Sequence, residues 1–213
     1  MNYIRKTVGA NLASPQLSWK GHLVMQMMKR KNDYLERCAV NHCKISEGEK
    51  ILEIGFGHGL GLHYAANTGK ASKVYGIDIS QLALQYAEEL LYAEIASSKV
   101  VLFESSVHNI PLNSSTIDTA FSVNSFYFWP HIPQACTELL RVIKPGGRLL
   151  TVQNIDSILK RRRSGGFNQA NVDFLAYMQT LEDVGFLDVH ITYLTDEVTH
   201  KPYQCISATA HHT

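Results

Sequence analysis

Glycine recurs at every second position from Gly55 to Gly61 in the stretch ILEIGFGHGLG, residues 51–61. The stretch starts with a short apolar run, which predicts a buried central strand, and a short helix is expected to follow through Ala66. Glycines between a strand and a helix leave the backbone bare, so a ligand can approach the amide groups at the helix start. This arrangement is typical of nucleotide-like cofactor sites, although a glycine turn by itself can be only a tight connection.

An acidic residue follows at the distance that a ribose site requires. Asp78 closes the next expected strand, KVYGIDIS at residues 73–80, about twenty residues beyond the glycines. A carboxylate in this place can accept hydrogen bonds from both ribose hydroxyls, or it can simply be solvated or cap the next helix. The pattern G-x-G-x-x-G of dinucleotide sites is not met, because Leu60 and Leu62 stand where its third glycine would be.

The rest of the chain alternates strand and helix signals. Further strands are expected over residues 99–105, 117–126, 148–153, 187–194 and 203–210, and helices over 21–42, 81–96, 133–143 and 174–184. Residues 154–169 are expected to form a mobile loop. The alternation predicts an α/β fold, a Rossmann-like, doubly wound and mostly parallel seven-stranded sheet. A helical arm, residues 1–45, is expected to cover the site of a core domain formed by residues 46–213.

The overall composition limits the classes of function. The chain has 213 residues, of which 45% are hydrophobic and 18% charged, as in a globular domain with a sizeable core. Its net charge of +1 argues against a nucleic-acid binder, which would carry a clear basic excess. We expect no membrane span. The cysteines form no metal-binding or paired pattern, so we expect reduced thiols, no metal site and a cytoplasmic location.

Four segments, taken in order, resemble the class I S-adenosylmethionine-dependent methyltransferases, in the broad branch that includes ubiquinone and menaquinone biosynthesis enzymes. They are ILEIGFGHG, VYGIDIS, NIPLNSSTIDTAFS and LLRVIKPGGRLL, within residues 50–153. The resemblance implies S-adenosylmethionine as cofactor and methyl transfer as the reaction. In the glycine segment it implies cofactor contacts from Glu53, Gly55, Gly57 and Gly59.

The resemblance also implies roles for later residues. Asp78 would bind the ribose hydroxyls, Ile79 would lie against the adenine, and Asn124 would contact the methionine end. The family often has GDA in the loop after the third strand, where this chain has Ser105, Ser106 and Val107. Ser106 and Val107 are therefore expected to contact the adenine without the usual acid.

The segment NSFYFWPH, residues 124–131, is expected at the carboxyl ends of the strands, where ligands of this fold bind. Its aromatic side chains could wall an apolar or cationic acceptor, or could pack under the arm. The candidate acceptor contacts are Phe126, Trp129 and, on the arm, Trp19 and His22. His131 and Tyr127 are the candidate catalytic residues, needed as a base only if the acceptor must lose a proton.

The favoured hypothesis is methyl transfer to a small molecule, with an oxygen, nitrogen or carbon acceptor atom undetermined and no nucleic-acid partner. One alternative is a non-catalytic S-adenosylmethionine-binding or interaction protein, because the residues 105–107 depart from the family and no base is evident. Another is an NAD-dependent oxidoreductase, which the glycine spacing disfavours. The basic run Lys160–Arg163 is either a solvated loop or a lid for an anionic acceptor. The sequence does not determine the oligomeric state.

Overall fold

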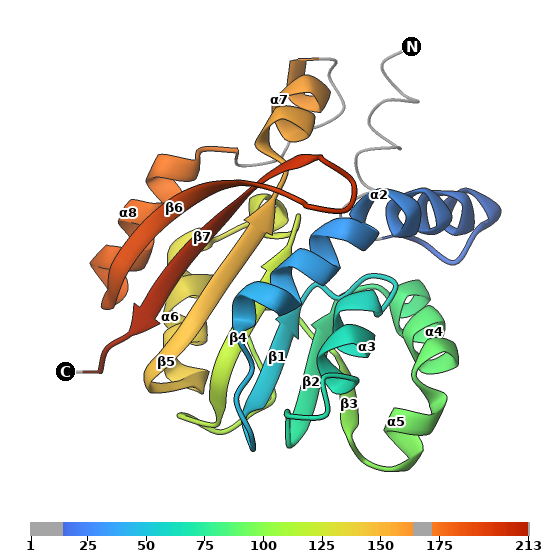
Figure 1. The fold of residues 1–213 in the computed structure, drawn as a ribbon, viewed down its shortest axis with the longest axis horizontal. Helices are drawn as coiled ribbons and strands as arrows, with labels where there is room; N and C mark the ends of the chain where they lie inside the picture. Colours follow the sequence, from blue (N-terminus) through green and yellow to red (C-terminus); the bar gives the residue numbers. More distant parts are fainter. Residues whose placement is uncertain (1–14, 164–171, 213) are drawn as a thin grey trace.

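The structure is a computed structural model that describes residues 15–163 and 172–212 (Figure 1). Within these residues the strands form one seven-stranded sheet in the order β3-β2-β1-β4-β5-β7-β6. The strands are β1 (Lys50–Ile54), β2 (Lys73–Asp78), β3 (Val100–Glu104), β4 (Ile117–Val123), β5 (Ile143–Gln153), β6 (Phe186–Thr195) and β7 (Pro202–Ala210). The helices are α2 (Trp19–Cys43), α3 (Leu60–Ala66), α4 (Gln81–Leu90), α5 (Tyr92–Ala96), α6 (Ile132–Val142), α7 (Ile155–Arg163) and α8 (Phe174–Val184), with a 3-10 turn η1 (Phe126–Phe128).

The sheet is parallel except at one strand. β1 pairs with β2 and β4, β2 with β3, and β4 with β5, all in parallel, whereas β7 runs antiparallel between β5 and β6. The expected doubly wound, mostly parallel seven-stranded sheet is therefore confirmed. The chain order reverses between β1 and β4, and ligands of open α/β sheets bind outside the carboxyl ends of the strands at such a point.

Helices cover both faces because successive residues of the central strands point to opposite sides. Ile51 packs in one apolar cluster with side chains of α2, α3 and α4. Its neighbour Leu52 packs in a second cluster with side chains of α6 and α8. The glycine turn after β1 thus projects from a strand that is fixed on both faces.

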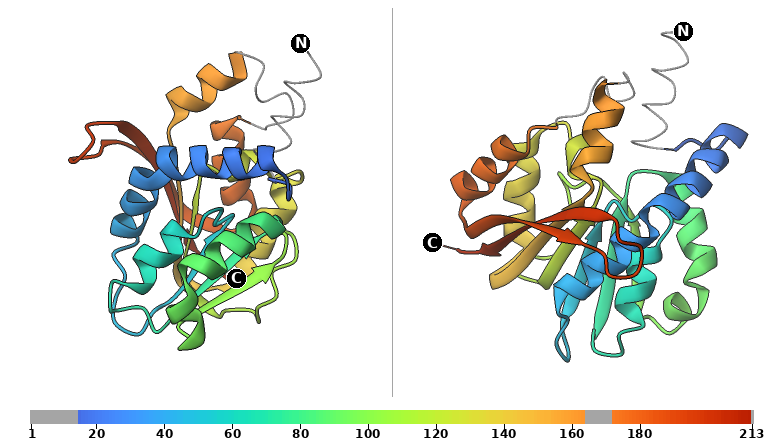
Figure 2. Two further views of the ribbon diagram at one scale, coloured as in Figure 1. Left: turned by 90° about the vertical axis from the view of Figure 1, so that its right-hand side faces the viewer. Right: turned by 45° about the horizontal axis from the view of Figure 1, so that its top comes forward.

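Helix α2 forms the described part of the arm and extends the expected helix by one or two residues at each end. Ser18 caps it, since its Oγ accepts a hydrogen bond of 3.1 Å from the Gly21 amide. Figure 2 shows that α2 bends: its first half crosses the carboxyl end of the sheet and its second half runs down one face. Residues 1–14 of the predicted arm lie outside the described residues.

The expectation of a loop over residues 154–169 is wrong for residues 155–163, which form helix α7 at the carboxyl end of the sheet (Figures 1 and 2). Asn154 starts this helix, because its Oδ1 accepts a hydrogen bond of 2.8 Å from the Ser157 amide. Ile158 is buried and anchors it. The basic residues of the run fall in the last turn, where positive charge complements the helix dipole. Residues 164–169 lie outside the described residues.

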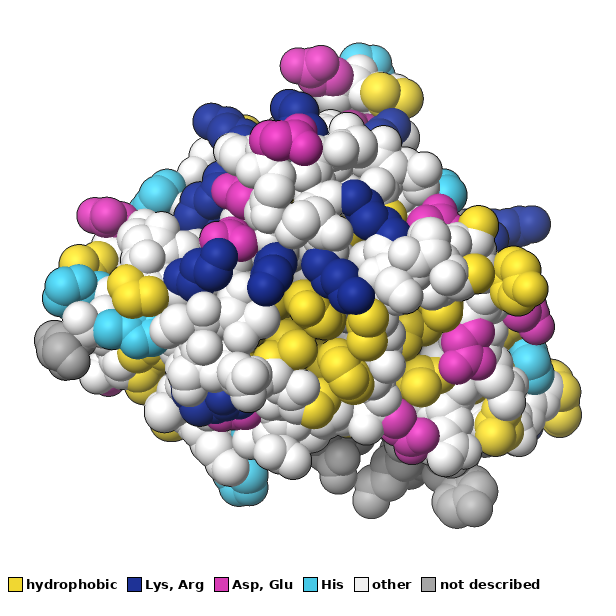
Figure 3. All heavy atoms as spheres, turned by 90° about the horizontal axis from the view of Figure 1, so that it is seen from below, with side chains coloured by type: hydrophobic (Ala, Val, Ile, Leu, Met, Phe, Trp, Pro, Cys, Tyr) yellow, Lys and Arg dark blue, Asp and Glu magenta, His cyan; other side chains and the backbone are white. Residues whose placement is uncertain are grey.

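The opposite end of the molecule, where the parallel strands begin, carries a row of basic side chains beside an apolar area (Figure 3). Some basic side chains at this end are paired with carboxylates. At the start of β5, Lys144 pairs with Asp118 at 2.5 Å and Arg148 pairs with Glu49 at 2.8 Å. Among the described helices, none has both the length and the apolar composition needed to cross a bilayer.

Candidate active site

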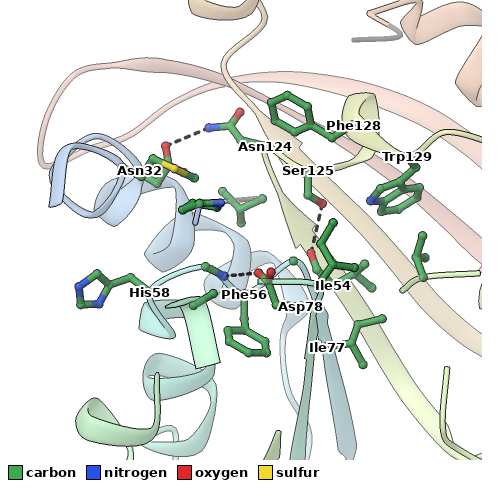
Figure 4. A pocket seen from close by; sticks show the side chains of 18 of the residues that line it. Asn32, Ile54, Phe56, His58, Ile77, Asp78, Asn124, Ser125, Phe128 and Trp129 are labelled. Carbon is green, nitrogen blue, oxygen red and sulfur yellow. Dashed lines mark hydrogen bonds between the residues drawn. The ribbon is translucent and has the colours of Figure 1, made fainter. Parts of the chain in front are cut away.

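A cavity lies at the carboxyl ends of β1, β2 and β4, beneath the first half of α2 (Figure 4). Its walls come from the glycine turn, the end of β2, the loop after β3, the segment after β4 and one face of α2. The sequence-predicted residues that line it are Gly55, Gly57, Asp78, Ile79, Ser106, Val107, Asn124 and Trp129. Segments that are far apart in the chain therefore meet at the point where the strand order reverses.

The glycines of the turn have different tasks. Gly57 adopts a φ of +52°, which favours glycine, and a Cβ there would meet no described atom within 4 Å. It therefore presents bare backbone to the cavity. A Cβ on Gly59 would lie 3.0 Å from the Cβ of Ala87, so Gly59 allows α3 to pack against α4 and does not line the cavity. His58 does line it, and burial lowers the pKa of its ring.

Asp78 is fixed by the backbone on both sides. Its Oδ2 accepts a hydrogen bond of 2.9 Å from the Gly57 amide and its Oδ1 one of 2.9 Å from the Ser80 amide. Burial raises its pKa to about 6, although these amide hydrogen bonds act in the opposite direction. Each carboxylate oxygen keeps a further acceptor position toward the cavity. Beside it, the apolar side chain of Ile79 is 54% exposed and offers a flat ligand an open surface.

Glu53 and Glu36 form a buried pair behind the glycine turn. Glu53 comes from β1 and Glu36 from α2, and their carboxyl groups meet at Gly61, where an added Cβ would lie within 2.8 Å of both. Burial, and then the neighbouring carboxyl group, raises the pKa of Glu53 well above its usual range, and burial also raises that of Glu36. Two carboxyl groups this close in a buried site are compatible only if at least one of them is protonated. Glu36 lines the cavity, whereas Glu53 lies behind it.

Asn124 stands on the far side of the cavity from Asp78 (Figure 4). It follows β4 with a φ of +50°, a conformation that costs energy for a residue other than glycine and is concentrated at functional sites. Its Nδ2 donates a hydrogen bond of 3.1 Å to Asn32 Oδ1 on α2. Its Oδ1 is buried and has no hydrogen-bond partner among the described residues. The side chain therefore holds an unused acceptor at the cavity wall.

A second cavity of about 640 Å³ adjoins the first. It lies between α2, the segment after β4, α7 and the β6–β7 connection. The residues that line both cavities are Met28, Asn32, Asn124 and Phe128. The Asn32–Asn124 hydrogen bond thus marks the boundary between two adjoining spaces.

The residues of the aromatic segment after β4 lie in four different environments. Tyr127 lines the second cavity, and burial raises the pKa of its hydroxyl above the ordinary value, so the group stays protonated and suits a donor better than a base. Trp129 lines the first cavity. Phe126 lines neither and stacks on Tyr177 in the core, with ring centroids 4.4 Å apart. His131 is exposed outside both cavities, and its carbonyl accepts a hydrogen bond of 3.2 Å from His108 Nε2.

The arm reaches the site with residues other than those predicted. The structure places Trp19 and His22 away from both cavities: Trp19 is 73% exposed, and His22 Nδ1 lies 2.8 Å from the Tyr86 hydroxyl. The residues of α2 that line the first cavity are Met25, Met28, Lys29, Asn32 and Glu36. Their spacing of three to four residues is a helical stripe that the sequence already contains. The prediction for the arm relied on an aromatic residue and a histidine, and it therefore missed this stripe.

Comparison with known proteins gives consistent results. A family model described as a methyltransferase domain matches residues 52–151. The uncharacterized methyltransferase YdaC of Bacillus subtilis is 27% identical over 86% of this chain and 94% of its own length. Erythromycin 3''-O-methyltransferase of Saccharopolyspora erythraea is 25% identical over 80% of this chain, but the matched region spans only 61% of that protein. A methyltransferase structure from Aquifex aeolicus has the same fold, with a TM-score of 0.66 and 21% identity over 87% of this chain and 98% of its own.

The first cavity fits S-adenosylmethionine in its chemistry. It offers a carboxylate with free acceptor positions on Asp78, bare backbone at Gly57 and exposed apolar surface at Ile79. At its other side it offers the Asn124 Oδ1, which has no partner among the described residues, and the carboxyl group of Glu36. Within the described part of the chain, no group of three or more potential metal ligands occurs. The family model, the relatives and the chemistry of the cavity together support a class I S-adenosylmethionine-dependent methyltransferase.

Proposed function

We propose that this enzyme methylates a small molecule that binds in the second cavity. The observation that supports this proposal most strongly is the contact between the two cavities at Asn32, Asn124 and Phe128. One space has the groups that suit the cofactor, and the adjoining space is available to the acceptor. A volume of about 640 Å³ is within the range of roughly 300–1,000 Å³ typical of small-molecule sites.

In this proposal the chain's own residues mainly position the reactants and exclude water. S-adenosylmethionine, when bound, supplies a methyl group on a positively charged sulfur that is already reactive. Asp78 would hold the ribose hydroxyls, while Ile79 and Val107 would pack against the adenine. Asn124, with its unused acceptor oxygen, would receive the amino group of the methionine part, and Glu36 would lie at the same end of the cavity.

The remaining members of the predicted cofactor set would act less directly. Glu53 would act through Glu36, because it lies behind the cavity wall and its carboxyl group meets that of Glu36 at Gly61. Gly59 would set the position of α3, and Gly55 and Ser106 would contribute to the wall. Substitution of these residues is therefore expected to alter cofactor affinity mainly through the shape of the site.

The boundary residue Phe128 and its neighbour Tyr127 would orient the acceptor. Phe128 and Tyr127 offer aromatic surface, and the protonated Tyr127 hydroxyl can donate a hydrogen bond. Holding two reactants side by side supplies a large part of the rate in such reactions, because the entropy of bringing them together is lost on binding. Catalysis by position accounts for a site whose predicted base, His131, lies at the surface.

A small acceptor is also supported by charge and by similarity. The net charge of +1 gives no long-range field for a polyanion. The relative named erythromycin 3''-O-methyltransferase acts, by its name, on a small molecule. Neither observation identifies an acceptor for this chain, and the shape of the second cavity is the more specific support.

The proposal can be tested by incubating the protein with S-adenosylmethionine that carries a tritiated methyl group and with a fractionated cell extract. We expect label in the small-molecule fraction. A heat-inactivated sample and an Asp78→Ala variant are the controls. Label that appears in RNA, DNA or protein, and falls steeply with added salt, would contradict the proposal.

A further inference from the structure

The second cavity has an excess of positively charged side chains, whereas the chain as a whole is almost neutral. Five cationic side chains line it, against one carboxylate, Asp156. The cationic residues are Arg30, Lys31, Lys160, Arg161 and Lys201. The whole chain has 20 basic and 19 acidic residues, so this is a strong local excess. Such a concentration of one sign in a concave site raises the local potential for an anion.

These cations converge from three parts of the chain. Arg30 and Lys31 lie on α2, Lys160 and Arg161 on α7, and Lys201 just before β7. Formation of α7 is what brings the run Lys160–Arg163 to the site, and only its first two members line the cavity. The convergence therefore depends on the fold and does not follow from the basic run alone.

Ion pairing within the chain does not account for three of these cations. In the described parts of the chain, Arg30, Lys31 and Lys160 form no ion pair. The other end of the sheet differs, since Lys144 and Arg148 pair there with carboxylates. Like charges that converge in one cavity repel one another, and an anionic ligand would relieve this repulsion.

The cavity also has an apolar side. Tyr127 and Ile158 are buried within its wall, and Met28 and Phe128 are half-buried beside them. Arg30, Lys31, Lys160 and Lys201 are all exposed. Charge is thus concentrated at the mouth and apolar surface toward the bottom, next to the boundary with the first cavity. A ligand that matches both parts has an acidic group at one end and an apolar body at the other.

We propose that the acceptor is a small anionic amphiphile whose carboxylate or phosphate group is held by the cations at the mouth of the second cavity and whose apolar body lies against Phe128 and Tyr127. This inference rests on the proposed function and narrows the class of acceptor. It places the acidic group at the mouth and, beside Asn124, the other end of the molecule, which carries the nucleophilic oxygen, nitrogen or carbon that takes the methyl group.

The test uses simple probes that share one chain length: octanoate, octyl phosphate, 1-octanol and octylamine. Their binding is measured by calorimetry with the full-length protein in saturating S-adenosylhomocysteine. We expect at least one of the two anions to bind tenfold or more tightly than 1-octanol, and octylamine to bind most weakly. Preference for the anion should fall when the salt concentration is raised from 50 to 500 mM. This change shortens the Debye length from about 14 to about 4 Å, so the exposed charges are screened.

Two triple variants with the same change in net charge distinguish the effect of the cations in the cavity from that of surface charge in general. The triple variant Arg30→Gln, Lys160→Gln, Lys201→Gln removes three cations of the cavity. The control, Lys20→Gln, Arg162→Gln, Lys70→Gln, removes the same charge from exposed residues outside it, two of them on the same helices α2 and α7. We expect the first variant to lose the anion preference at least tenfold while keeping its affinity for 1-octanol, and the control to retain it.

Equal binding of all four probes, no binding of either anion, or an equal loss in both triple variants would overturn the inference. The identity of the labelled product separates this inference from the proposed function. A labelled small molecule that is neutral or cationic would overturn the anionic assignment and leave small-molecule methylation intact. Label in a macromolecule would overturn both.

Discussion

The carboxyl group of Glu36, on the helix that covers the site, meets the carboxyl group of Glu53, on the central strand that leads into the glycine turn. The pair is enclosed beneath Gly61, where a larger side chain would collide with both. Two buried carboxylates cannot both be ionised without a large cost, so one proton is shared between them. The contact links α2 to the strand that positions the cofactor site.

The Glu36–Glu53 pair should make stability depend on pH. Burial raises the pKa of Glu36 from 4.5 to about 8, so the folded state keeps a proton that the unfolded state loses. The contribution of this raised pKa to the free energy of unfolding is complete below pH 4.5, and it is lost as the pH rises toward 8. Glu36→Gln should reduce this fall and stabilise the protein at pH 8 by about 1–3 kcal/mol, because its amide can donate to Glu53. Urea unfolding across this range, with the exposed Glu182→Gln as control, measures it, and an unchanged slope would contradict the shared proton.

Asp78→Ala should weaken S-adenosylhomocysteine binding by about 1.5–3 kcal/mol, the value of hydrogen bonds to a charged acceptor. Because the pKa of Asp78 is about 6, the affinity of the wild type should also fall as the pH is lowered through 6, where the acceptor becomes protonated. Calorimetry measures both effects, with Asp183→Ala on α8 as a distant control. Wild-type affinity in the Asp78 variant would remove this residue from the site.

Gly57→Ala tests the bare backbone of the turn against a control with matched strain. Gly57 and Gly48 both have positive φ, +52° and +81°, and an added Cβ would meet no described atom at either position. Each substitution should cost roughly 1–2 kcal/mol of stability, the cost of left-handed backbone for alanine. Only Gly57→Ala should also weaken cofactor binding. Equal cofactor affinity in the two variants would show that backbone approach at Gly57 is unimportant.

Asn124→Gly should separate strain from chemistry. Glycine accepts the φ of +50° at this position, so the variant should be at least as stable as the wild type even though the hydrogen bond to Asn32 is lost. Loss of the Asn124 acceptor should lower kcat/KM by roughly tenfold or more, corresponding to about 1.4 kcal/mol. Thermal unfolding and steady-state kinetics measure the two effects. A stable variant with full activity would show that the Asn124 side chain does not contribute to methyl transfer.

The sequence predicted the parts of the site that depend on local order along the chain. The glycine turn follows β1 directly and Asp78 ends β2, so adjacency in a parallel sheet brings them together without further information. The pattern of apolar runs was enough for the strands, because strands buried on both faces are nearly continuous in apolar residues.

The parts that it missed depend on tertiary contacts. Helix α7 forms because Asn154 caps it and because Ile158 is buried. The burial of Ile158 cannot be predicted from a segment in which charged residues predominate. Glu36 is one of two acidic residues on α2, with Asp33, and its role becomes visible only because α2 bends over the sheet and brings it to Glu53. The cationic mouth of the second cavity likewise requires α2, α7 and the start of β7 to converge.

The separation of the two cavities can be tested most directly by blocking one of them. Ser157 is an exposed residue of α7 that lines only the second cavity, so Ser157→Trp fills this space and Ser157→Ala is its control. Tritium transfer to the small-molecule fraction is measured together with S-adenosylhomocysteine binding. The account predicts that Ser157→Trp binds the cofactor product like the wild type but loses most of the methyl transfer, while Ser157→Ala keeps both. Full transfer by Ser157→Trp, or a parallel loss of cofactor binding, would contradict it.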